Sequence, residues 1–303
     1  MGESNALTKE LKLLCSQAKP KQALNFVQSK RRSGVYPTSA DYVCIVQCCI
    51  RYKAITEGKA LHAHILDSGV TATIFLWTSI MNMYIQWGYL TEARHVFNSM
   101  TCPDLIAWNM MIGAYTKFGK SRLAFQLFGF LECGRMRPDS VTLVSILKAC
   151  SSVSNLNFGM YIHGHMLKFG VEISLFAANT LINMYTKCGS IANARGVFDK
   201  MVLRNVVSWT AMIAGYAKHD QCMEALCLYR RMLCDGILPN EVTFVSALNA
   251  CSGMGDLEEG KLVSMDVKRS GIKPNIFMEN ASIDMFIKCG SFGDAWKIFT
   301  NMA

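Results

Sequence analysis

Apolar side chains recur along this chain with the spacing of one helical face. Ala93, Val96, Phe97 and Met100 stand at i, i+3, i+4 and i+7, which places them on a single stripe of an α-helix. The stripe recurs at Ala194, Val197, Phe198 and Met201, and at Ala295, Ile298, Phe299 and Met302. A glycine precedes each copy, at Gly88, Gly189 and Gly290. Glycine closes a helix in the left-handed conformation, so the pattern predicts an all-α protein in which these residues form the framework.

The copies lie 101 residues apart, and this period runs through almost the whole chain. Matching landmarks are Trp108 with Trp209, Tyr115 with Tyr216, Pro138 with Pro239, and Cys150 with Cys251. Each period divides into three helix pairs of 35, 35 and 31 residues. The predicted motifs are a degenerate pair within 1–38 and then 39–73, 74–104, 105–139, 140–174, 175–205, 206–240, 241–275 and a truncated 276–303. We therefore expect an α-solenoid of about nine antiparallel helix pairs, counted as one elongated array.

Composition narrows the class of protein further. Hydrophobic residues make up 51% of the chain and charged residues 17%, which suits helices buried on two sides. The formal charge of +9 is spread along the chain and favours an anionic partner, with a merely soluble basic protein as the alternative. Thirteen cysteines at largely apolar positions predict a reducing compartment rather than a disulfide framework. No apolar run approaches the roughly 18 to 20 residues of a membrane span.

Two histidine motifs are the candidates for binding a metal ion. His62 with His64 and His163 with His165 form two His-x-His motifs. Residues two positions apart on a helix point to opposite sides, so we do not expect a metal site. Cys-x-x-Cys, His-x-Glu and phosphate-loop motifs are absent from the sequence, and we expect no catalytic residues and no cofactor. Residues 1–13 do not form a recognisable organelle presequence or secretion signal.

Two positions of the motifs carry a restricted set of polar residues. The fifth residues of the first long and the short motifs are Thr78, Asn109, Asn179, Thr210 and Asn280. The last residues of the complete motifs among these are Asp104, Asp139, Asn205 and Asn240. Helix capping and turns explain these residue types. The four different pairings instead favour a variable recognition surface on a constant frame.

The motifs that carry this pattern resemble the pentatricopeptide repeat family, in its plant class of long, long and short triplets. Copies of the short motif read NMYIQWGYLTEARHVFNSM, NMYTKCGSIANARGVFDKM and DMFIKCGSFGDAWKIFTNM. Copies of the first long motif read AWNMMIGAYTKFG and SWTAMIAGYAKHD. Copies of the second long motif read VTLVSILKAC and VTFVSALNAC. The resemblance implies a right-handed superhelix that holds single-stranded RNA in its concave groove. Extension motifs and a DYW deaminase domain are not expected in this chain.

The resemblance also implies a role for individual residues. The fifth and last residues of a motif contact one base, while an apolar second residue, here Ile106, Phe176 or Val207, stacks against it. Thr78 with Asp104 suggests G, Asn109 with Asp139 suggests U, Asn179 with Asn205 suggests a pyrimidine, and Thr210 with Asn240 suggests A. Val144 with Ser174 and Val245 with Asn275 are expected to read weakly or not at all, because an apolar fifth residue cannot hydrogen-bond a base. The predicted site is 5′-G-U-n-Y-A-n-3′.

These expectations lead to a hypothesis about function. The chain is expected to bind RNA as a monomer in a plant mitochondrion, or alternatively a chloroplast, and to recognise sites for C-to-U RNA editing with a deaminase or other editing factor acting in trans. Transcript stabilisation or splicing is the alternative within RNA biology. A protein-binding scaffold of the tetratricopeptide type is the alternative outside it.

Overall fold

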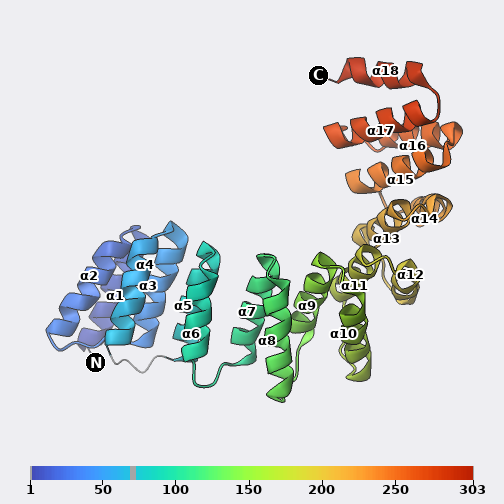
Figure 1. The fold of residues 1–303 in the computed structure, drawn as a ribbon. Coiled ribbons are helices and arrows are strands. Elements are labelled where there is room, and N and C mark those ends of the chain that lie inside the picture. The colour runs from blue at the N-terminus through green and yellow to red at the C-terminus, as the bar shows by residue number, and fades with distance from the viewer. Residues whose placement is uncertain (1, 69–72, 303) are drawn as a thin grey trace. The chain divides into compact units, whose positions relative to one another are not determined.

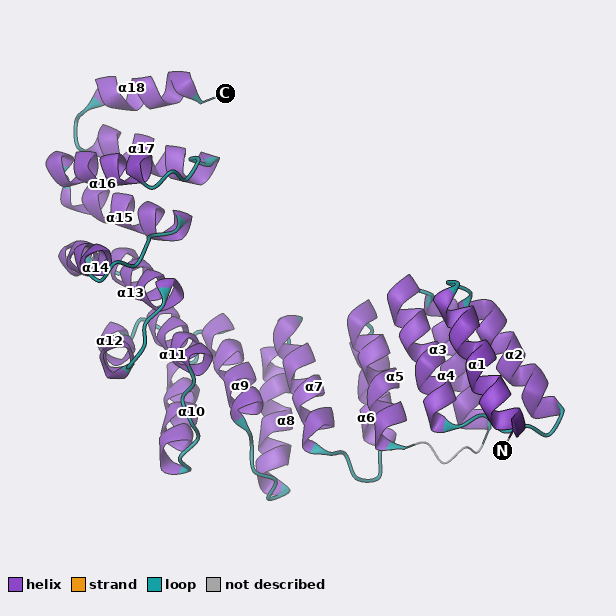
Figure 2. Cartoon of the chain, turned by 180° about the vertical axis from the view of Figure 1, so that it is seen from behind, coloured by secondary structure: helices purple, strands orange, loops and turns teal. Residues whose placement is uncertain are grey.

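The computed structural model describes residues 2–68 and 73–302. Within these ranges the chain folds into eighteen α-helices and has no strand (Figures 1 and 2). Their bounds are α1 Gly2–Ser16, α2 Pro20–Arg32, α3 Ser39–Tyr52, α4 Ile55–Asp67, α5 Ile74–Trp87, α6 Leu90–Ser99, α7 Leu105–Lys117, α8 Ser121–Cys133, α9 Ser140–Ser152, α10 Leu156–Lys168, α11 Leu175–Lys187, α12 Ile191–Lys200, α13 Val206–Lys218, α14 Cys222–Cys234, α15 Glu241–Met254, α16 Leu257–Arg269, α17 Ile276–Lys288 and α18 Phe292–Asn301. The all-α solenoid expected from the helical period is confirmed.

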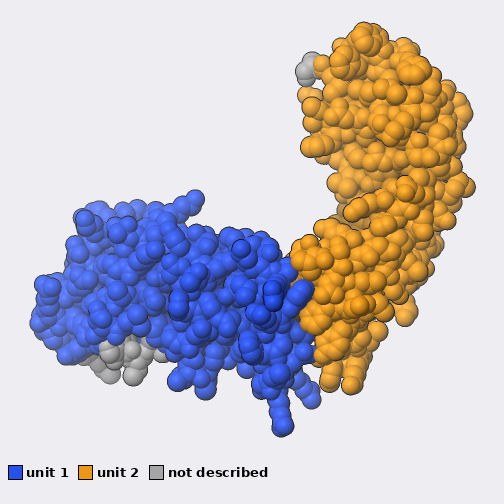
Figure 3. All heavy atoms as spheres, in the orientation of Figure 1, with its two compact units in different colours: residues 1–145 blue, residues 146–303 orange. Residues whose placement is uncertain are grey.

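The chain divides into two compact units, residues 1–145 and 146–303 (Figure 3). The division falls inside α9, so the series of helix pairs passes through it without a linker. In the first unit the first helices of successive pairs pack on one another, from α1 through α3 and α5 to α7. In the second unit α11, α13, α15 and α17 do the same. Each unit therefore has a continuous layer of first helices, against which the second helices pack.

Capping residues and glycines set the limits of the helices. From α3 onward, each first helix begins directly after a short polar residue: Thr38, Thr73, Asp104, Asp139, Ser174, Asn205, Asn240 and Asn275. In the short pairs a glycine with positive φ follows the end of the first helix within two residues, at Gly88 (82°), Gly189 (78°) and Gly290 (77°). The left-handed closure expected of these glycines is confirmed.

The predicted apolar stripe is buried in the first two of its copies, apart from the half-buried Met201. Ala93, Val96 and Phe97 on α6 and Ala194, Val197 and Phe198 on α12 are all less than a tenth exposed. In α18 only Ala295 is buried, whereas Phe299 is 58% exposed. The expectation that all three stripes form the framework is therefore wrong for α18, which contacts only α17 among the described helices.

A second set of glycines recurs with the 101-residue period. Gly58, Gly159 and Gly260 lie on the second helices α4, α10 and α16 and face the next first helix. A Cβ atom on Gly159 would lie 2.4 Å from the sulfur of the buried Met184, and one on Gly260 would lie 2.3 Å from that of Met285. Glycine is needed at these positions because two helices approach each other closely there.

Candidate nucleic-acid interface

The last residue of each predicted motif caps the first helix of the next. Its side-chain oxygen accepts a backbone N–H from the first helical turn, which satisfies a donor that the helix cannot. The bonds are Ala107 N to Asp104 Oδ1 at 2.9 Å, Thr142 N to Asp139 Oδ1 at 2.8 Å, Ala177 N to Ser174 Oγ at 3.3 Å, Ser208 N to Asn205 Oδ1 at 3.1 Å, Thr243 N to Asn240 Oδ1 at 2.9 Å and Met278 N to Asn275 Oδ1 at 3.0 Å. Capping thus accounts for the short polar residues at this position.

Capping also determines which polar atom of the side chain remains available to bond another group. Since Oδ1 is used by the helix, an Asp presents its second oxygen, Oδ2, and an Asn presents its amide nitrogen, Nδ2. Oδ2 of an ionised Asp only accepts hydrogen bonds, whereas Nδ2 of Asn only donates them. The same backbone frame therefore offers an acceptor at Asp104 and Asp139 and a donor at Asn205 and Asn240.

The fifth residue lies beside the last residue in three of the four predicted pairs. Asn109 Nδ2 donates to both carboxylate oxygens of Asp139 at 3.0 Å. Asn179 Nδ2 donates to Asn205 Oδ1 at 3.3 Å, and Thr210 Oγ1 donates to Asn240 Oδ1 at 3.5 Å. The two polar positions that were singled out in the sequence therefore form paired sites at these three motifs.

The fourth pair differs. The Thr78 hydroxyl bonds the carbonyl oxygens of Ile74 and Phe75, both at 3.0 Å, in its own helix. Within the part of the chain that the structure describes, no hydrogen bond joins Thr78 to Asp104. Burial does not distinguish this pair, because Thr78 and Thr210 are each 8% exposed. The fifth and last residues of this motif are therefore not joined by the hydrogen bond that links the other three pairs in the described part of the chain.

The fifth residues of the second long motifs have a different environment. Val144 is buried at 5% exposure and Val245 is half-buried. The amide of Asn275 donates to the Glu241 carboxylate. Ser174 is exposed, and so is Asn280, the fifth residue of the last motif. An aliphatic fifth residue leaves nothing to pair with the last residue at these two motifs.

The second residues of the motifs form an exposed apolar row on the first helices. Ile106, Phe176 and Val207, which the resemblance singles out, are 63%, 59% and 50% exposed. Four equivalent residues were missed: Phe75, Val141, Val242 and Phe277, at 64%, 59%, 56% and 73% exposure. Their motif position alone could have identified them. Apolar side chains exposed at one fixed position of successive repeats indicate a binding surface.

A hollow of about 520 Å³ in the second unit is lined by the second, fifth and last residues of one motif. Phe176 and Val207 line it together with Asn179 and Asn205. Lys148 also lines it and places Nζ 4.7 Å from the centre of the Phe176 ring, a cation–π contact. Apolar walls and paired amides in one hollow suit a flat ring with polar edges.

Lysines lie next to this hollow. Asn183 lines it and also lines a neighbouring hollow of about 180 Å³ that contains Lys187 and Lys218. Both lysines are exposed and occupy the thirteenth position of their motifs, as do the exposed Lys117 and Lys288. These lysines were not among the residues predicted from the sequence to contact RNA. It supplies positive charge beside the paired polar residues.

The charge state of Asp139 follows from its hydrogen bonds. Burial alone would raise the pKa of this carboxyl group, but hydrogen bonds from the Thr142 backbone and hydroxyl and from Asn109 outweigh burial and hold the pKa below its usual value. Asp139 is therefore a carboxylate at neutral pH, and it can only accept hydrogen bonds.

His62, His64 and His163 contact tyrosines on neighbouring helices, whereas the ring of His165 lies near Tyr161 of its own helix and Phe169 at the end of that helix. His62 Nδ1 lies 3.0 Å from the Tyr84 hydroxyl, and His163 Nδ1 lies 2.8 Å from the Tyr185 hydroxyl. His64 faces Tyr42 instead, so the two rings of that motif point to different helices. In residues 2–68 and 73–302, no group of three or more His, Cys, Asp or Glu side chains is arranged to hold a metal ion.

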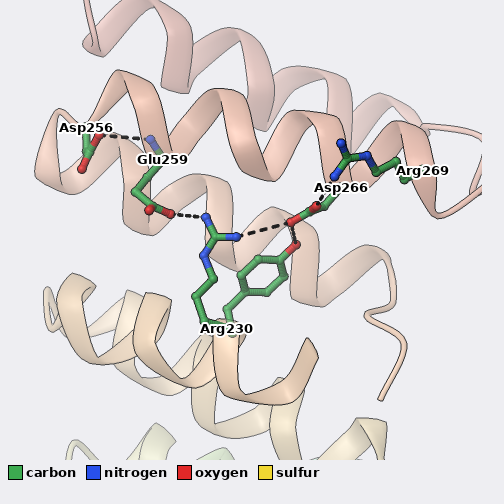
Figure 4. A network of polar contacts seen from close by, with 6 residues as sticks. Arg230, Asp256, Glu259, Asp266 and Arg269 are labelled. Atoms are coloured by element: carbon green, nitrogen blue, oxygen red, sulfur yellow. Dashed lines mark hydrogen bonds and ion pairs between the residues drawn. The ribbon is translucent and has the colours of Figure 1, made fainter. Parts of the chain in front are cut away.

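A polar network joins α14 and α16, which are the second helices of two successive pairs (Figure 4). Arg230 bonds Glu259 and lies 3.7 Å from Asp266, which accepts the Tyr229 hydroxyl at 3.0 Å. Burial, together with the Asp266 charge, raises the pKa of Tyr229, so its hydroxyl stays protonated and keeps this bond. We assign the network to packing of the two helices.

Comparison with known proteins identifies the repeats. The PPR repeat family matches residues 103–152 and 204–253, and the PPR repeat matches residues 75–102 and 176–206. The chain belongs to the pentatricopeptide repeat family. Together these pentatricopeptide repeat matches cover about half of the chain and include all six residues of the three paired sites.

The related pentatricopeptide repeat proteins include some named as chloroplastic and some named as mitochondrial. CRR2, chloroplastic, of Arabidopsis thaliana is 33% identical over 288 residues, which cover 93% of this chain and 44% of the relative. At2g03880, mitochondrial, of the same plant is 30% identical over 300 residues, which cover 99% and 47%. The chain thus spans less than half the length of either relative. The crystal structure of PPR10 in complex with an 18-nt psaJ RNA element has a TM-score of 0.69 at 16% identity, over 99% of this chain and 50% of that one, which is a likeness of fold.

No helix in the described ranges is long and apolar enough to cross a membrane.

Proposed function

We propose that the chain binds single-stranded RNA in a plant organelle and reads individual bases through the paired fifth and last residues of its motifs. The single observation that carries the proposal is the hollow that Phe176 and Val207 line together with Asn179 and Asn205. A base can stack against apolar and aromatic side chains while its edge faces the amides. Lys187 and Lys218 lie beside this hollow, where a phosphate backbone would need positive charge.

The chemistry of each pair assigns a base class. Uracil and guanine have a ring N–H that the Asp139 or Asp104 carboxylate can accept, whereas cytosine and adenine have a ring acceptor to which the amide of Asn205 or Asn240 can donate. With the fifth residues Thr78 and Thr210 for purines and Asn109 and Asn179 for pyrimidines, the proposed site remains 5′-G-U-n-Y-A-n-3′. The weak positions correspond to Val144 and Val245.

The proposed process is recognition of C-to-U editing sites, with the reaction supplied by a deaminase or other editing factor in trans. We assign the chain to the class of long, long and short triplets, and to binding rather than catalysis. The names of the relatives support an organellar location, either chloroplast or mitochondrion. Transcript stabilisation or splicing by occupation of the RNA uses the same surface and is the second candidate.

Equilibrium binding at physiological salt tests the proposal. The probes are a short RNA that contains GUnYAn and the same RNA with G and A exchanged. We expect binding to the first RNA to be about tenfold tighter or more, since a wrong base typically costs about 1–3 kcal/mol in hydrogen-bonded recognition. Equal affinity for both RNAs would contradict base reading. Absence of binding to either would favour a protein-binding scaffold.

A further inference from the structure

A third residue accompanies each of the three paired sites. The third residue of the following motif carries a hydroxyl that reaches the fifth residue. Ser208 Oγ donates to Asn179 Oδ1 at 2.7 Å, and Thr142 Oγ1 donates to Asn109 Oδ1. Thr243 Oγ1 lies 2.7 Å from Thr210 Oγ1. The contact therefore occurs once in the first unit and twice in the second.

The hydroxyls are inaccessible to a ligand. Thr142, Ser208 and Thr243 are all fully buried, with 0% exposure. They cannot contact RNA, so any influence on base recognition must pass through the fifth residue or through the last residue. Oδ1 of the last residue lies 2.8 Å from the hydroxyl oxygen of Thr142, 3.1 Å from that of Ser208 and 2.9 Å from that of Thr243. The backbone of the last residue contributes to the placement of two of them, because Asn205 N donates to Ser208 Oγ and Asn240 N donates to Thr243 Oγ1, each at 3.3 Å. These bonds occupy the hydroxyl oxygen as an acceptor and direct its proton away from the backbone.

The presence of the hydroxyl follows the chemistry of the fifth residue. Where the fifth residue is Val43, Val144 or Val245, the third residue of the next motif is Leu76, Ala177 or Met278. Where it is Asn109, Asn179 or Thr210, the third residue is Thr142, Ser208 or Thr243. Thr78 is followed by Ala107 and bonds its own helix instead. Capping alone does not require this correlation, because Ala107 and Ala177 are capped without a hydroxyl.

We propose that the buried hydroxyl of the third residue orients the side chain of the preceding fifth residue and so sets the specificity of base reading. An Asn side chain has two orientations that exchange its oxygen and nitrogen. A hydroxyl donating to Oδ1 selects the one in which Nδ2 faces the last residue, as seen at Asn109 and Asn179. Thr142, Ser208 and Thr243 are positioning residues in this sense. The proposal rests on the proposed function of the paired sites.

Thr142→Val and Thr142→Ser test the proposal at the second base of the site. Valine keeps the shape of threonine without its hydroxyl, and serine keeps the hydroxyl. Affinities are measured for GUnYAn RNA and for the same RNA with C in place of U. We expect Thr142→Val to lower the preference for U over C by about fivefold, the effect of one hydrogen bond, and Thr142→Ser to restore it.

The outcomes separate this proposal from the proposed function. A wild-type protein without preference for U would overturn base reading itself. A wild-type preference that Thr142→Val retains in full would overturn the positioning role alone. Equal weakening of binding to both RNAs by Thr142→Val would also overturn it, because the hydroxyl would then only support the fold.

Ser208→Ala gives an independent test in the second unit. Its matched control is Ser246→Ala, since Ser246 is also a buried serine and, among the described residues, its hydroxyl donates to the Val242 carbonyl of its own helix. We expect Ser208→Ala to reduce by about fivefold the preference for a pyrimidine over a purine at the fourth base, and Ser246→Ala to leave it unchanged. Equal preferences in the two variants would contradict the proposal.

Discussion

Asn179 and Asn205 are 26 residues apart in the chain, yet the amide of the first donates to the side-chain oxygen of the second at 3.3 Å. Asn205 can be there because it also caps α13, which fixes its side chain at the start of that helix. The same geometry joins Asn109 to Asp139 through the cap of α9. Helix capping thus positions the residues that we propose read RNA, and fold and recognition depend on the same side chains.

Phe176 should contribute to RNA affinity without contributing to sequence preference. Its ring is exposed beside the paired amides and can stack on any base. Phe176→Ala should weaken binding to GUnYAn RNA by about 1–3 kcal/mol, roughly 5- to 150-fold. Phe130→Ala is the control, since Phe130 is equally exposed at 59% but lies on a second helix. Equal effects of the two variants in a binding titration would show that the row of second residues is not the contact surface.

Lys187 and Lys218 should account for part of the salt dependence of binding. If each neutralises one phosphate, the double variant Lys187→Ala/Lys218→Ala should reduce the slope of log K against log salt by about 1.4, at about 0.7 per contact for a single strand. Lys168→Ala/Lys200→Ala, on the second helices α10 and α12, has the same change in charge and should alter the slope less. Slopes are obtained from titrations at several salt concentrations. Identical slopes for the two double variants would contradict a phosphate row.

Acid should destabilise the fold through His62 and His163. Burial lowers the pKa of both imidazoles, and Lys200 lowers that of His163 further. In the unfolded chain they protonate near pH 6.5, so below about this pH the unfolded state binds more protons and stability falls. Thermal unfolding at pH 7.5 and 5.5 should therefore show a lower Tm at pH 5.5, with a smaller difference in His62→Gln/His163→Gln. The control His95→Gln, at an exposed position, should keep the wild-type difference. The same pH dependence in the double variant would exclude these two histidines as its source.

Periodicity and capping chemistry made the fold predictable. The 101-residue period located the helix pairs, and residues such as Asp104 and Asn240 marked helix starts because few residue types can cap a helix. The pairing of Asn109 with Asp139 was also accessible, because both positions vary within a narrow set of polar residues. The motif boundaries and the bases assigned to each pair remain proposals.

Other features required the three-dimensional arrangement. The first helices are apolar on most of their surface, so the sequence pattern could not separate the exposed Phe75 and Val141 from buried neighbours such as Leu76. Thr78 has the expected residue type, but its hydroxyl bonds its own helix, since Ala107 offers no side-chain partner. The buried hydroxyl of Thr142 contacts a residue of the preceding motif, a relationship that local patterns do not contain.

The central claim is that the last residue chooses between bases by presenting an acceptor or a donor. Asp139→Asn tests it most directly, because asparagine can keep the cap on α9 through Oδ1 and changes only the second polar atom. Binding is measured with GUnYAn RNA and with the same RNA carrying C in place of U, and Asp199→Asn, an exposed change on α12, is the control. We predict that the wild type and the control prefer U and that Asp139→Asn loses this preference or prefers C. An unchanged preference for U in Asp139→Asn would contradict the account.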